Sequence, residues 1–146
     1  MNTHLEAFSA SYRALQAAHL AEFGPASTTS QPVILVGDLN SDPNDASVNQ
    51  PDPTPNNRAV NLLTGTFGYV DTWIQVNPLE PGFTSGFNEL VNDEDTSGLR
   101  KRIDHVMTRP QFTVQTSKVT GTDSDNRTPD GLWASDHAGV VTALAP

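Results

Sequence analysis

The feature that most constrains this chain is a short apolar run that ends in a cluster of polar residues. Residues 33–36, Val-Ile-Leu-Val, are closed by Gly37 and followed directly by Asp38, Asn40 and Asp42. An unbroken β-branched and aliphatic run of this length predicts a strand that is buried on both faces. Because ligands of α/β sheets bind outside the carboxyl ends of strands, the polar cluster is a candidate site. The alternative is that Asp38 and Asn40 only close a turn, as these residue types often do after strands.

The size and charge of the chain narrow the possible classes of protein. A length of 146 residues suits one compact domain, so we expect a single domain over residues 1–146. The absence of cysteine excludes disulfides and thiolate metal sites, which leaves carboxylates, amides, hydroxyls and histidines for site chemistry. A net charge of −9 argues against a non-specific nucleic-acid-binding protein, because such proteins need a basic face. A nuclease that recruits divalent cations is less constrained by this charge.

A helix of about five turns is predicted near the N-terminus, because apolar residues recur there at spacings of three and four. The members of this stripe are Leu5, Phe8, Tyr12, Leu15, His19 and Phe23. The pair Gly24-Pro25 ends the pattern. We expect the stripe to pack on the core, which makes His19 a residue at the edge of the core without a catalytic role.

Further along the chain, the pattern predicts a long loop, a second helix and several strands. Residues 44–57 are rich in Pro, Asn and Asp and are expected to form a surface loop, and residues 59–63 a short helix. Strands are expected over residues 99–108, 112–120 and 138–144. Two helices and five or six strands without a regular βαβ order predict a mixed α/β sandwich.

The first cluster resembles a calcium-binding loop, and this possibility fails on two positions. Asp38, Asn40 and Asp42 match the first three ligand positions of an EF-hand loop. Pro43 stands where the sharp turn needs Gly, and Asn49 stands where a bidentate Glu is expected. EF-hand-like calcium binding is therefore excluded.

Carboxylates also stand beside histidines at two later places in the sequence. Asp136 precedes His137 just before the last predicted strand, and such a pair can hold a metal or move protons near neutral pH, although it also occurs by chance in loops. Asp104 and His105 are neighbours in a predicted strand, so their side chains face opposite ways. We therefore expect Asp104 to orient another histidine and His105 to be structural or exposed. His4 is expected near a strand end.

Six short motifs together resemble the endonuclease/exonuclease/phosphatase superfamily, which has the deoxyribonuclease I-like fold. In chain order they are NTHL at 2–5, GDLNSDP at 37–43, DTW at 71–73, GFT at 82–84, RIDHV at 102–106 and SDHAGV at 135–140. The resemblance covers essentially the whole chain. It implies an α+β fold, namely half or most of a four-layered α/β-β/α sandwich with mixed, mainly antiparallel sheets. It also implies metal-dependent hydrolysis of phosphoesters.

The resemblance implies a role for each matched polar residue. His4 would contact the scissile phosphate, Asp38 would orient or deprotonate the attacking water, and Asn40 would hydrogen-bond a phosphate oxygen. Asp104 would pair with His137 and fix its tautomer. His137 would act as a general base or stabilise charge on the phosphate. Such a set is chemically coherent, because in-line attack needs an activated water and donors for the phosphate oxygens.

The resemblance also implies a metal and points to a missing part of the site. Asp136 would help to bind or position Mg²⁺ or Mn²⁺. Members of the superfamily carry an Asn, a metal-binding Glu and most of the first sheet in an N-terminal half, and neither Glu6 nor Glu22 sits in a matching motif. The chain therefore resembles a C-terminal half. Its expected partners are a phosphodiester substrate and either a complementing N-terminal half or a second copy at an exposed sheet face.

The function predicted from the sequence is that of a divalent-metal-dependent phosphodiester hydrolase of the nuclease or phosphodiesterase class. One alternative is a non-catalytic half-domain that binds phosphate-containing ligands, because the metal-binding Glu is absent. Another is a phospholipid hydrolase similar to sphingomyelinases, and the acidic net charge slightly favours small or lipid phosphoesters over duplex DNA. The substrate could be a nucleic acid, a small phosphoester or a lipid head group, and the sequence specifies neither it nor the compartment.

Overall fold

The computed structural model describes residues 1–109 and 112–145. The elements of this part, in chain order, are β1 (Asn2–His4), α1 (Ala10–Phe23), η1 (Pro25–Ser27), β2 (Val33–Asp38), α2 (Arg58–Gly65), β3 (Val70–Asp71), α3 (Thr72–Val76), β4 (Asp104–Arg109), β5 (Thr113–Thr120), η2 (Ser124–Asn126) and β6 (Gly139–Ala145). The fold is α+β with mixed sheets, as predicted. The described residues contain no helix long and apolar enough to cross a membrane.

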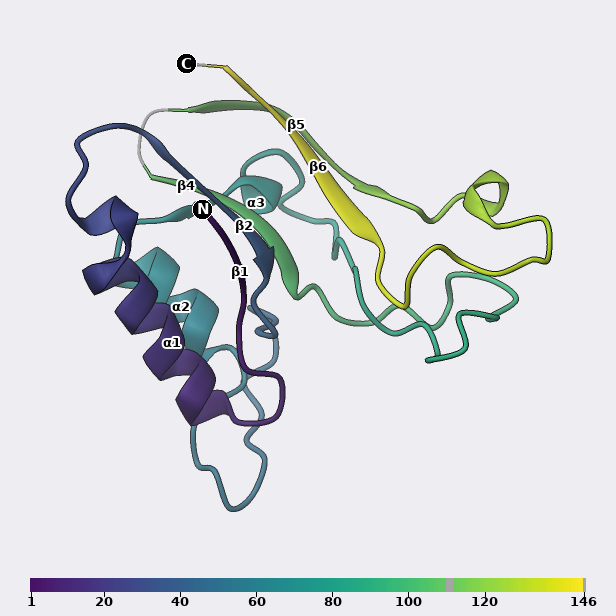
Figure 1. The fold of residues 1–146 in the computed structure, drawn as a ribbon, viewed down its shortest axis with the longest axis horizontal. Helices are drawn as coiled ribbons and strands as arrows, with labels where there is room; N and C mark the ends of the chain where they lie inside the picture. The colour runs from purple at the N-terminus through teal and green to yellow at the C-terminus, as the bar shows by residue number, and fades with distance from the viewer. Residues whose placement is uncertain (110–111, 146) are drawn as a thin grey trace.

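The strands of the described residues form one mixed sheet and one separate ribbon. The sheet has the order β1-β2-β4-β3, in which β1 runs parallel to β2 and the other neighbours are antiparallel. The ribbon consists of the antiparallel pair β5 and β6. Mainly antiparallel pairing is thereby confirmed. Helices α1 and α2 lie on one side of the sheet and the ribbon lies on the other (Figure 1). The complete four-layered sandwich stays a prediction.

Strand β2 lies in the interior of the sheet, between β1 and β4, but only one of its faces is fully buried. Val33 and Leu35 are buried, whereas Ile34 is 37% exposed. The prediction of burial on both faces is wrong, because helices cover one face of this sheet and the ribbon covers the other only in part. The strand thus alternates like one in an antiparallel sheet with one solvated face.

The pairing of β1 with β2 requires a glycine. Gly37 lies beside Thr3 in the register and has a φ of +140°. A Cβ at this position would lie 1.8 Å from the carbonyl oxygen of Thr3. Gly37 therefore lets β1 approach β2 closely just before the polar cluster that follows.

Helix α1 begins later than the apolar stripe suggests. The hydroxyl of Ser9 accepts the N–H of Tyr12 at 3.3 Å, which is a regular N-cap. The carboxylate of Asp52, in the long loop, also accepts the hydroxyl of Ser9 and the N–H of Ser11. The helix therefore starts at Ala10, and the chain before it forms a loop.

The face of α1 that packs on the core consists of small residues and one arginine, and the predicted orientation of the helix is wrong. The buried residues are Ala10, Arg13, Ala14, Ala17 and Ala21. Tyr12, Leu15 and Phe23, which were expected in the core, are 65–72% exposed. His19 is exposed as well and packs on the ring of Phe23 with centroids 5.1 Å apart. The alanines let the helix approach its neighbours closely, so the small-residue face is the one that packs inward.

The main core lies between the sheet and helices α1 and α2. Its buried members are Leu5, Ala17, Ala21, Ala26, Val33, Leu35, Leu39, Ala59, Val60, Leu63, Tyr69 and Met107. Because strands β2 and β4 and helix α2 all contribute to it, this core fixes the sheet edge at which the polar cluster emerges.

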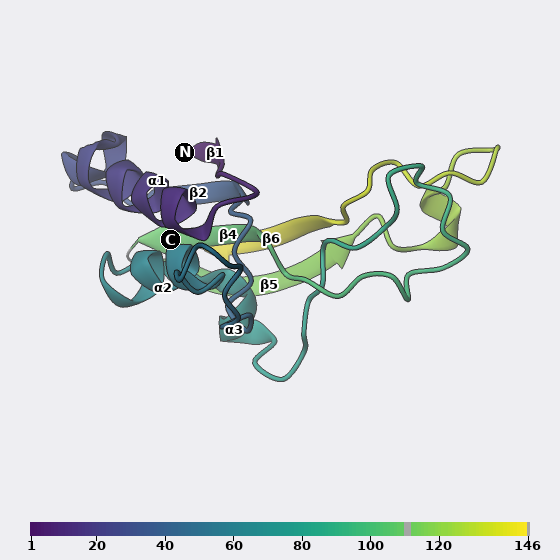
Figure 2. The ribbon, with the colours of Figure 1, turned by 90° about the horizontal axis from the view of Figure 1, so that it is seen from below.

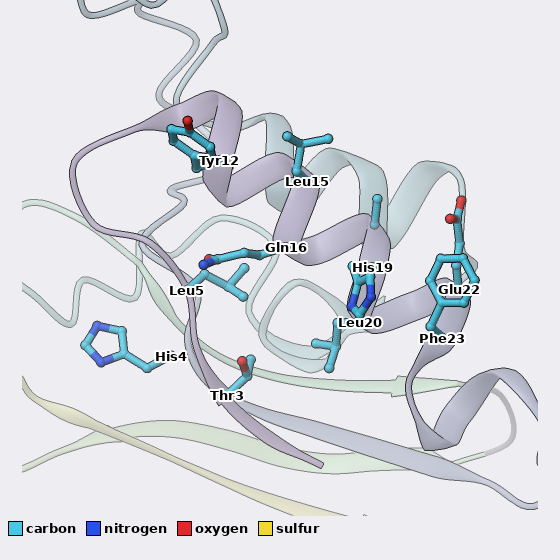
Figure 3. A pocket seen from close by; sticks show the side chains of 11 residues that line it. Thr3, His4, Leu5, Tyr12, Leu15, Gln16, His19, Leu20, Glu22 and Phe23 are labelled. Atoms are coloured by element: carbon cyan, nitrogen blue, oxygen red, sulfur yellow. The ribbon is translucent and has the colours of Figure 1, made fainter.

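A groove of about 650 Å³ lies between α1 and the outer edge of β1 (Figure 3). Its lining is mostly apolar and includes Leu5, Leu15 and Phe23, with His4 at one end. Among residues 1–109 and 112–145, strand β1 pairs with β2 alone and forms an edge of the sheet. The exposed stripe of α1 and the open edge of β1 thus form one continuous surface.

Hydroxyl groups connect the ribbon to the sheet. Thr72, at the start of α3, donates to the carbonyl oxygen of Val106 in β4 at 2.8 Å. The hydroxyl of Thr142 in β6 lies 3.1 Å from that of Thr72 and 3.0 Å from that of Ser117 in β5. The contact between the sheet and the ribbon is therefore partly polar.

Two long loops, residues 77–103 and 121–138, extend away from the sheet and the helices, as both views show (Figures 1 and 2). Trp133 joins the two loops. Its ring stacks on that of Phe87 with centroids 4.9 Å apart, and the Cζ atom of Arg127 lies over the Trp133 ring, 4.8 Å from its centroid. The indole N–H of Trp133 donates to the carbonyl oxygen of Asp93 at 3.0 Å. This small cluster joins the loop that leads to Asp104 to the loop that contains His137.

Candidate active site

Two neighbouring strands bring the first pair of site residues together. Strand β1 ends at His4 and strand β2 ends at Asp38, and these residues lie opposite one another in the parallel register. The Nε2 atom of His4 lies 3.3 Å from the Oδ2 atom of Asp38. The side chain of His4 is 71% exposed, so the ring is open to a ligand.

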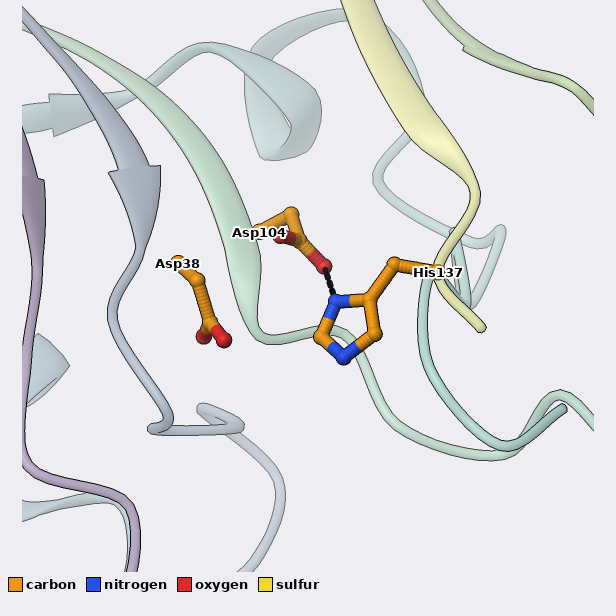
Figure 4. A group of neighbouring side chains, drawn as sticks. All are labelled: Asp38, Asp104 and His137. Carbon is orange, nitrogen blue, oxygen red and sulfur yellow. Dashed lines mark hydrogen bonds and ion pairs between the residues drawn. The ribbon is translucent and has the colours of Figure 1, made fainter. Parts of the chain in front are cut away.

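The second pair comes from the starts of β4 and β6. Asp104 lies opposite Asp38 in the antiparallel register, and His137 stands just before β6. The Nδ1 atom of His137 donates to the Oδ2 atom of Asp104 at 2.9 Å (Figure 4). This bond leaves the Nε2 atom on the side of the ring away from Asp104. The structure thus brings together the two residues that the sequence paired.

Asp38, Asp104 and His137 form a compact cluster of possible metal ligands. One ligand atom of each lies within 4.8 Å of those of the other two. Burial raises the pKa of Asp38, and the nearby carboxylate of Asp104 adds to this increase against the hydrogen bond from the N–H of Asn40. The hydrogen bond to Asp104 raises the pKa of His137 above its ordinary value, against the opposing effect of burial. Such a concentration of negative charge suits a cation or an imidazolium.

Asn40 holds the turn after β2 and the loop after His4. Its backbone lies in the left-handed region with a φ of +48°, and its N–H donates to Oδ1 of Asp38 at 2.7 Å. Its side-chain amide donates to the carbonyl oxygen of Leu5 at 3.0 Å. Asp38 and Asn40 therefore close the turn and also lie beside His4 at the candidate site. A contact from Asn40 to phosphate stays a prediction.

Asp136 lies next to the cluster in sequence but outside it in space. It is exposed, and the hydroxyl of Ser135 donates to its Oδ1 atom at 3.3 Å. It is not part of the group of three possible ligands found among the described residues. Its role as a metal ligand stays a prediction.

His105 faces away from the site, as the alternation of the strand predicts, and is buried in a separate ionic network. Its Nδ1 atom lies 3.3 Å from Oδ2 of Asp71, and its Nε2 atom lies 3.1 Å from the carbonyl oxygen of Ser41. The guanidinium of Arg102 donates to the same Oδ2 atom at 2.6 Å. Burial alone would raise the pKa of Asp71, but the hydrogen bond from His105 and the charges of His105 and Arg102 lower it. His105 is thus structural.

The sequence motifs that contain Asp71 and Thr84 were recognised without any role for these residues. Asp71 is the anion of the buried network, and it also caps α3 by accepting the N–H of Trp73 at 3.0 Å. Thr84 is fully buried between the chain segments that carry Asp104 and His137. Only membership in the DTW and GFT motifs could have drawn attention to them, because neither role depends on local periodicity.

Comparisons with known proteins agree with this fold. The family described as "Endonuclease/Exonuclease/phosphatase family" matches residues 2–137. A search of curated proteins finds no match. A 3′-5′ exonuclease from Neisseria meningitidis is similar in structure, with a TM-score of 0.71 and 22% identity over 99% of this chain and 60% of that chain.

Two further solved structures are similar over nearly the whole chain. An endonuclease/exonuclease/phosphatase protein from Beutenbergia cavernae has a TM-score of 0.65 and 26% identity over 97% of this chain and 33% of that one. A mannosyl-6-phosphatase from Bacteroides thetaiotaomicron has a TM-score of 0.65 and 21% identity over 99% of this chain and 50% of that one. The chain thus spans between a third and three fifths of the length of these three structures. With its family match over residues 2–137, the chain belongs to the endonuclease/exonuclease/phosphatase family.

Proposed function

We propose that the chain carries the catalytic edge of a divalent-metal-dependent phosphodiester hydrolase. The observation that supports this most directly is the bond from His137 to Asp104 beside the carboxylate of Asp38. A ring fixed through Nδ1 presents Nε2 to a ligand, and a neighbouring carboxylate can orient a water molecule. Family membership supports a phosphoester as the substrate of this arrangement.

The remaining polar groups fit a phosphate bound at the same edge. His4 lies beside Asp38 and is largely exposed, so its ring is free to contact a phosphate oxygen. Asn40 supplies an amide next to both residues, although its Nδ2 atom also holds the carbonyl oxygen of Leu5. Asp38 would orient or deprotonate the attacking water, and His137 would act as a base or stabilise charge on the phosphate.

The side chains present fit a hard divalent cation. Mg²⁺ is commonly bound through one or two carboxylates together with substrate phosphates, and Asp38 and Asp104 offer carboxylates within reach of one another. Asp136 would add a third carboxylate from the neighbouring loop. When bound, Mg²⁺ or Mn²⁺ would absorb the negative charge that develops on the phosphate.

Hydrolysis of bis(p-nitrophenyl) phosphate with and without Mg²⁺ or Mn²⁺ tests the proposal. We expect cleavage that a chelator stops and that falls by about 100-fold or more in His137→Ala, because general acid–base groups contribute this much. His19→Ala is the matched control, since His19 is exposed and packs on Phe23. Absence of cleavage by the wild-type chain at every metal concentration would contradict the proposed activity and favour the phosphate-binding alternative.

The substrate class requires a separate comparison. DNA, RNA and sphingomyelin vesicles all present phosphodiesters, and the same metal and the same variants apply to each. Selective cleavage of sphingomyelin would support the lipid alternative, and cleavage of a nucleic acid would support the nuclease class.

We also propose that the groove between α1 and β1 binds a polypeptide that corresponds to the unmatched part of the similar structures. The exonuclease and the phosphatase cover 99% of this chain but have 40–50% of their own length outside the match. The open edge of β1 offers backbone groups to a further strand, and the exposed stripe of α1 offers apolar contacts. Such a partner would lie beside His4, at the edge of the proposed site.

A further inference from the structure

Thr84 contacts the backbone of the segment that leads into Asp104. Its N–H donates to the carbonyl oxygen of Lys101 at 2.7 Å. Its hydroxyl oxygen accepts the N–H groups of Ile103 and Asp104, both at 3.2 Å. The side chain of Thr84 therefore holds the backbone N–H of Asp104 and that of the residue before it.

Thr84 also contacts the segment that carries His137. Its carbonyl oxygen accepts the N–H of Ala138 at 2.7 Å, directly after the histidine. The next residue, Ser85, forms bridge pairs with Lys101 on one side and with His137 on the other. Residues 84 and 85 thus lie between the segment that leads to Asp104 and the segment that carries His137.

The burial of Thr84 makes its contacts hard to replace. The residue is 0% exposed, so water cannot take over the hydrogen bonds of its hydroxyl. Asp104 begins a strand of the sheet and His137 stands before a strand of the separate ribbon. Their 2.9 Å bond therefore depends on how these two segments are held relative to one another.

We propose that Thr84 is a positioning residue that fixes Asp104 and His137 at hydrogen-bonding distance. Its hydroxyl fixes the position of the backbone at Asp104 by accepting the N–H of that residue, and its carbonyl oxygen fixes the backbone after His137 by accepting the N–H of Ala138. The catalytic consequence rests on the proposed function, whereas the structural consequence does not.

Substitution of Thr84 separates this role from general stabilisation. Thr84→Val keeps the shape and removes the hydroxyl, and Thr84→Ser keeps the hydroxyl. The matched control is Thr72→Val, because Thr72 is equally buried and its hydroxyl contacts the carbonyl oxygen of Val106 and the hydroxyl of Thr142 instead. A merely structural role would make the two valine variants alike at the site.

The first measurement is the proton resonance of the Nδ1–H of His137, identified by its absence from His137→Gln. We expect Thr84→Val to shift this resonance and to speed its exchange with solvent by about tenfold or more, because two buried N–H groups lose their acceptor. Thr84→Ser and Thr72→Val should leave it as in the wild type. An unchanged resonance in Thr84→Val, or an equal change in Thr72→Val, would overturn the proposal.

A second measurement covers the case in which Thr84→Val does not fold. The amides of Ile103, Asp104 and Ala138 in the wild-type chain should exchange slowly, and Thr84→Ser should preserve their protection. Fast exchange of these amides in the folded wild type would refute the proposed contacts.

Hydrolysis of bis(p-nitrophenyl) phosphate supplies the catalytic readout. Thr84→Val should lower kcat with little change in KM, and Thr84→Ser should restore kcat. If the wild type itself does not cleave, the proposed function fails, while the resonance of His137 still decides the role of Thr84.

Discussion

Neighbouring residues on the two faces of β4 differ in burial and in role. Asp104 is partly exposed and holds His137 at the surface, whereas the next residue, His105, is buried against Asp71. Asp71, Arg102 and His105 form a buried ionic network, and His105 joins it to the strand that carries Asp104. The ionisation of this network therefore affects the stability of the strand on which Asp104 is placed.

The stability contributed by Asp71 should depend on pH. Because the folded protein lowers the pKa of Asp71, its carboxylate stabilises the fold above the ordinary Asp pKa of about 3.9, and this contribution is lost as the pH falls through the lowered value. Asp71→Asn should cost about 3–5 kcal/mol at pH 7, since it leaves Arg102 buried without its counter-ion.

Urea unfolding of both proteins between pH 3 and pH 7 measures this difference. The gap in free energy of unfolding between the wild type and Asp71→Asn should narrow below the ordinary pKa of Asp. A gap that stays constant over this range would show that the charge of Asp71 does not stabilise the fold.

At the scale of elements, helix α1 shows how two periodic faces can compete. Leu15 and Ala17 lie on different faces of the same helix, and both faces have residues at spacings of three and four. Periodicity predicts a helix from either set but does not say which set packs inward. Here the small face packs, and the large apolar residues are left for solvent or a partner.

Two substitutions in α1 should therefore have unequal effects. Leu15→Gln should change the free energy of unfolding by less than about 0.5 kcal/mol, as expected for an exposed position. Ala17→Leu should cost about 1–3 kcal/mol, because Ala17 is completely buried and a larger side chain would overpack the core. Chemical denaturation of the two variants tests this, and a larger loss for Leu15→Gln would reverse the assignment of the faces.

The close pairing of β1 with β2 leads to another prediction. Gly37→Ala should loosen β1, because its Cβ would collide with the carbonyl oxygen of Thr3. Gly121→Ala is the control, since Gly121 also has a positive φ, of +81°, but the added Cβ would meet no described residue within 4 Å other than its chain neighbours. Amide exchange at Leu5, whose N–H donates to the carbonyl oxygen of Asp38, should accelerate only in Gly37→Ala. Equal acceleration in both variants would point to backbone strain rather than to collision.

At the scale of the whole molecule, the sequence predicted features that depend on local patterns better than features that depend on packing. Strand β2 and helix α2 follow from short apolar runs, and the motifs brought Asp104 and His137 to the same site. The buried face of α1 and the half-exposed β2 depend on which elements cover them, and no local pattern encodes this. The same limit applies to Thr84, whose partners lie far along the chain.

The exposed groove should make the isolated chain bind an apolar dye. Replacement of Leu15 and Phe23 by Glu should reduce binding of such a dye without loss of stability, because both residues are exposed. Light scattering after size-exclusion chromatography should give a monomer for both proteins. A wild-type dimer that the double variant abolishes would instead identify a second copy as the occupant of the groove.

The hydroxyl chain between the ribbon and the sheet has a consequence for alignment. A slip of β6 by one residue would bring Val141 or Ala143 to the place of Thr142 and leave the hydroxyls of Thr72 and Ser117 without their partner. The ribbon therefore has a single seating on the sheet. This alignment determines which side chains of β6 face the sheet, and the distance between His137 and Asp104 is left to the contacts of Thr84 with both segments.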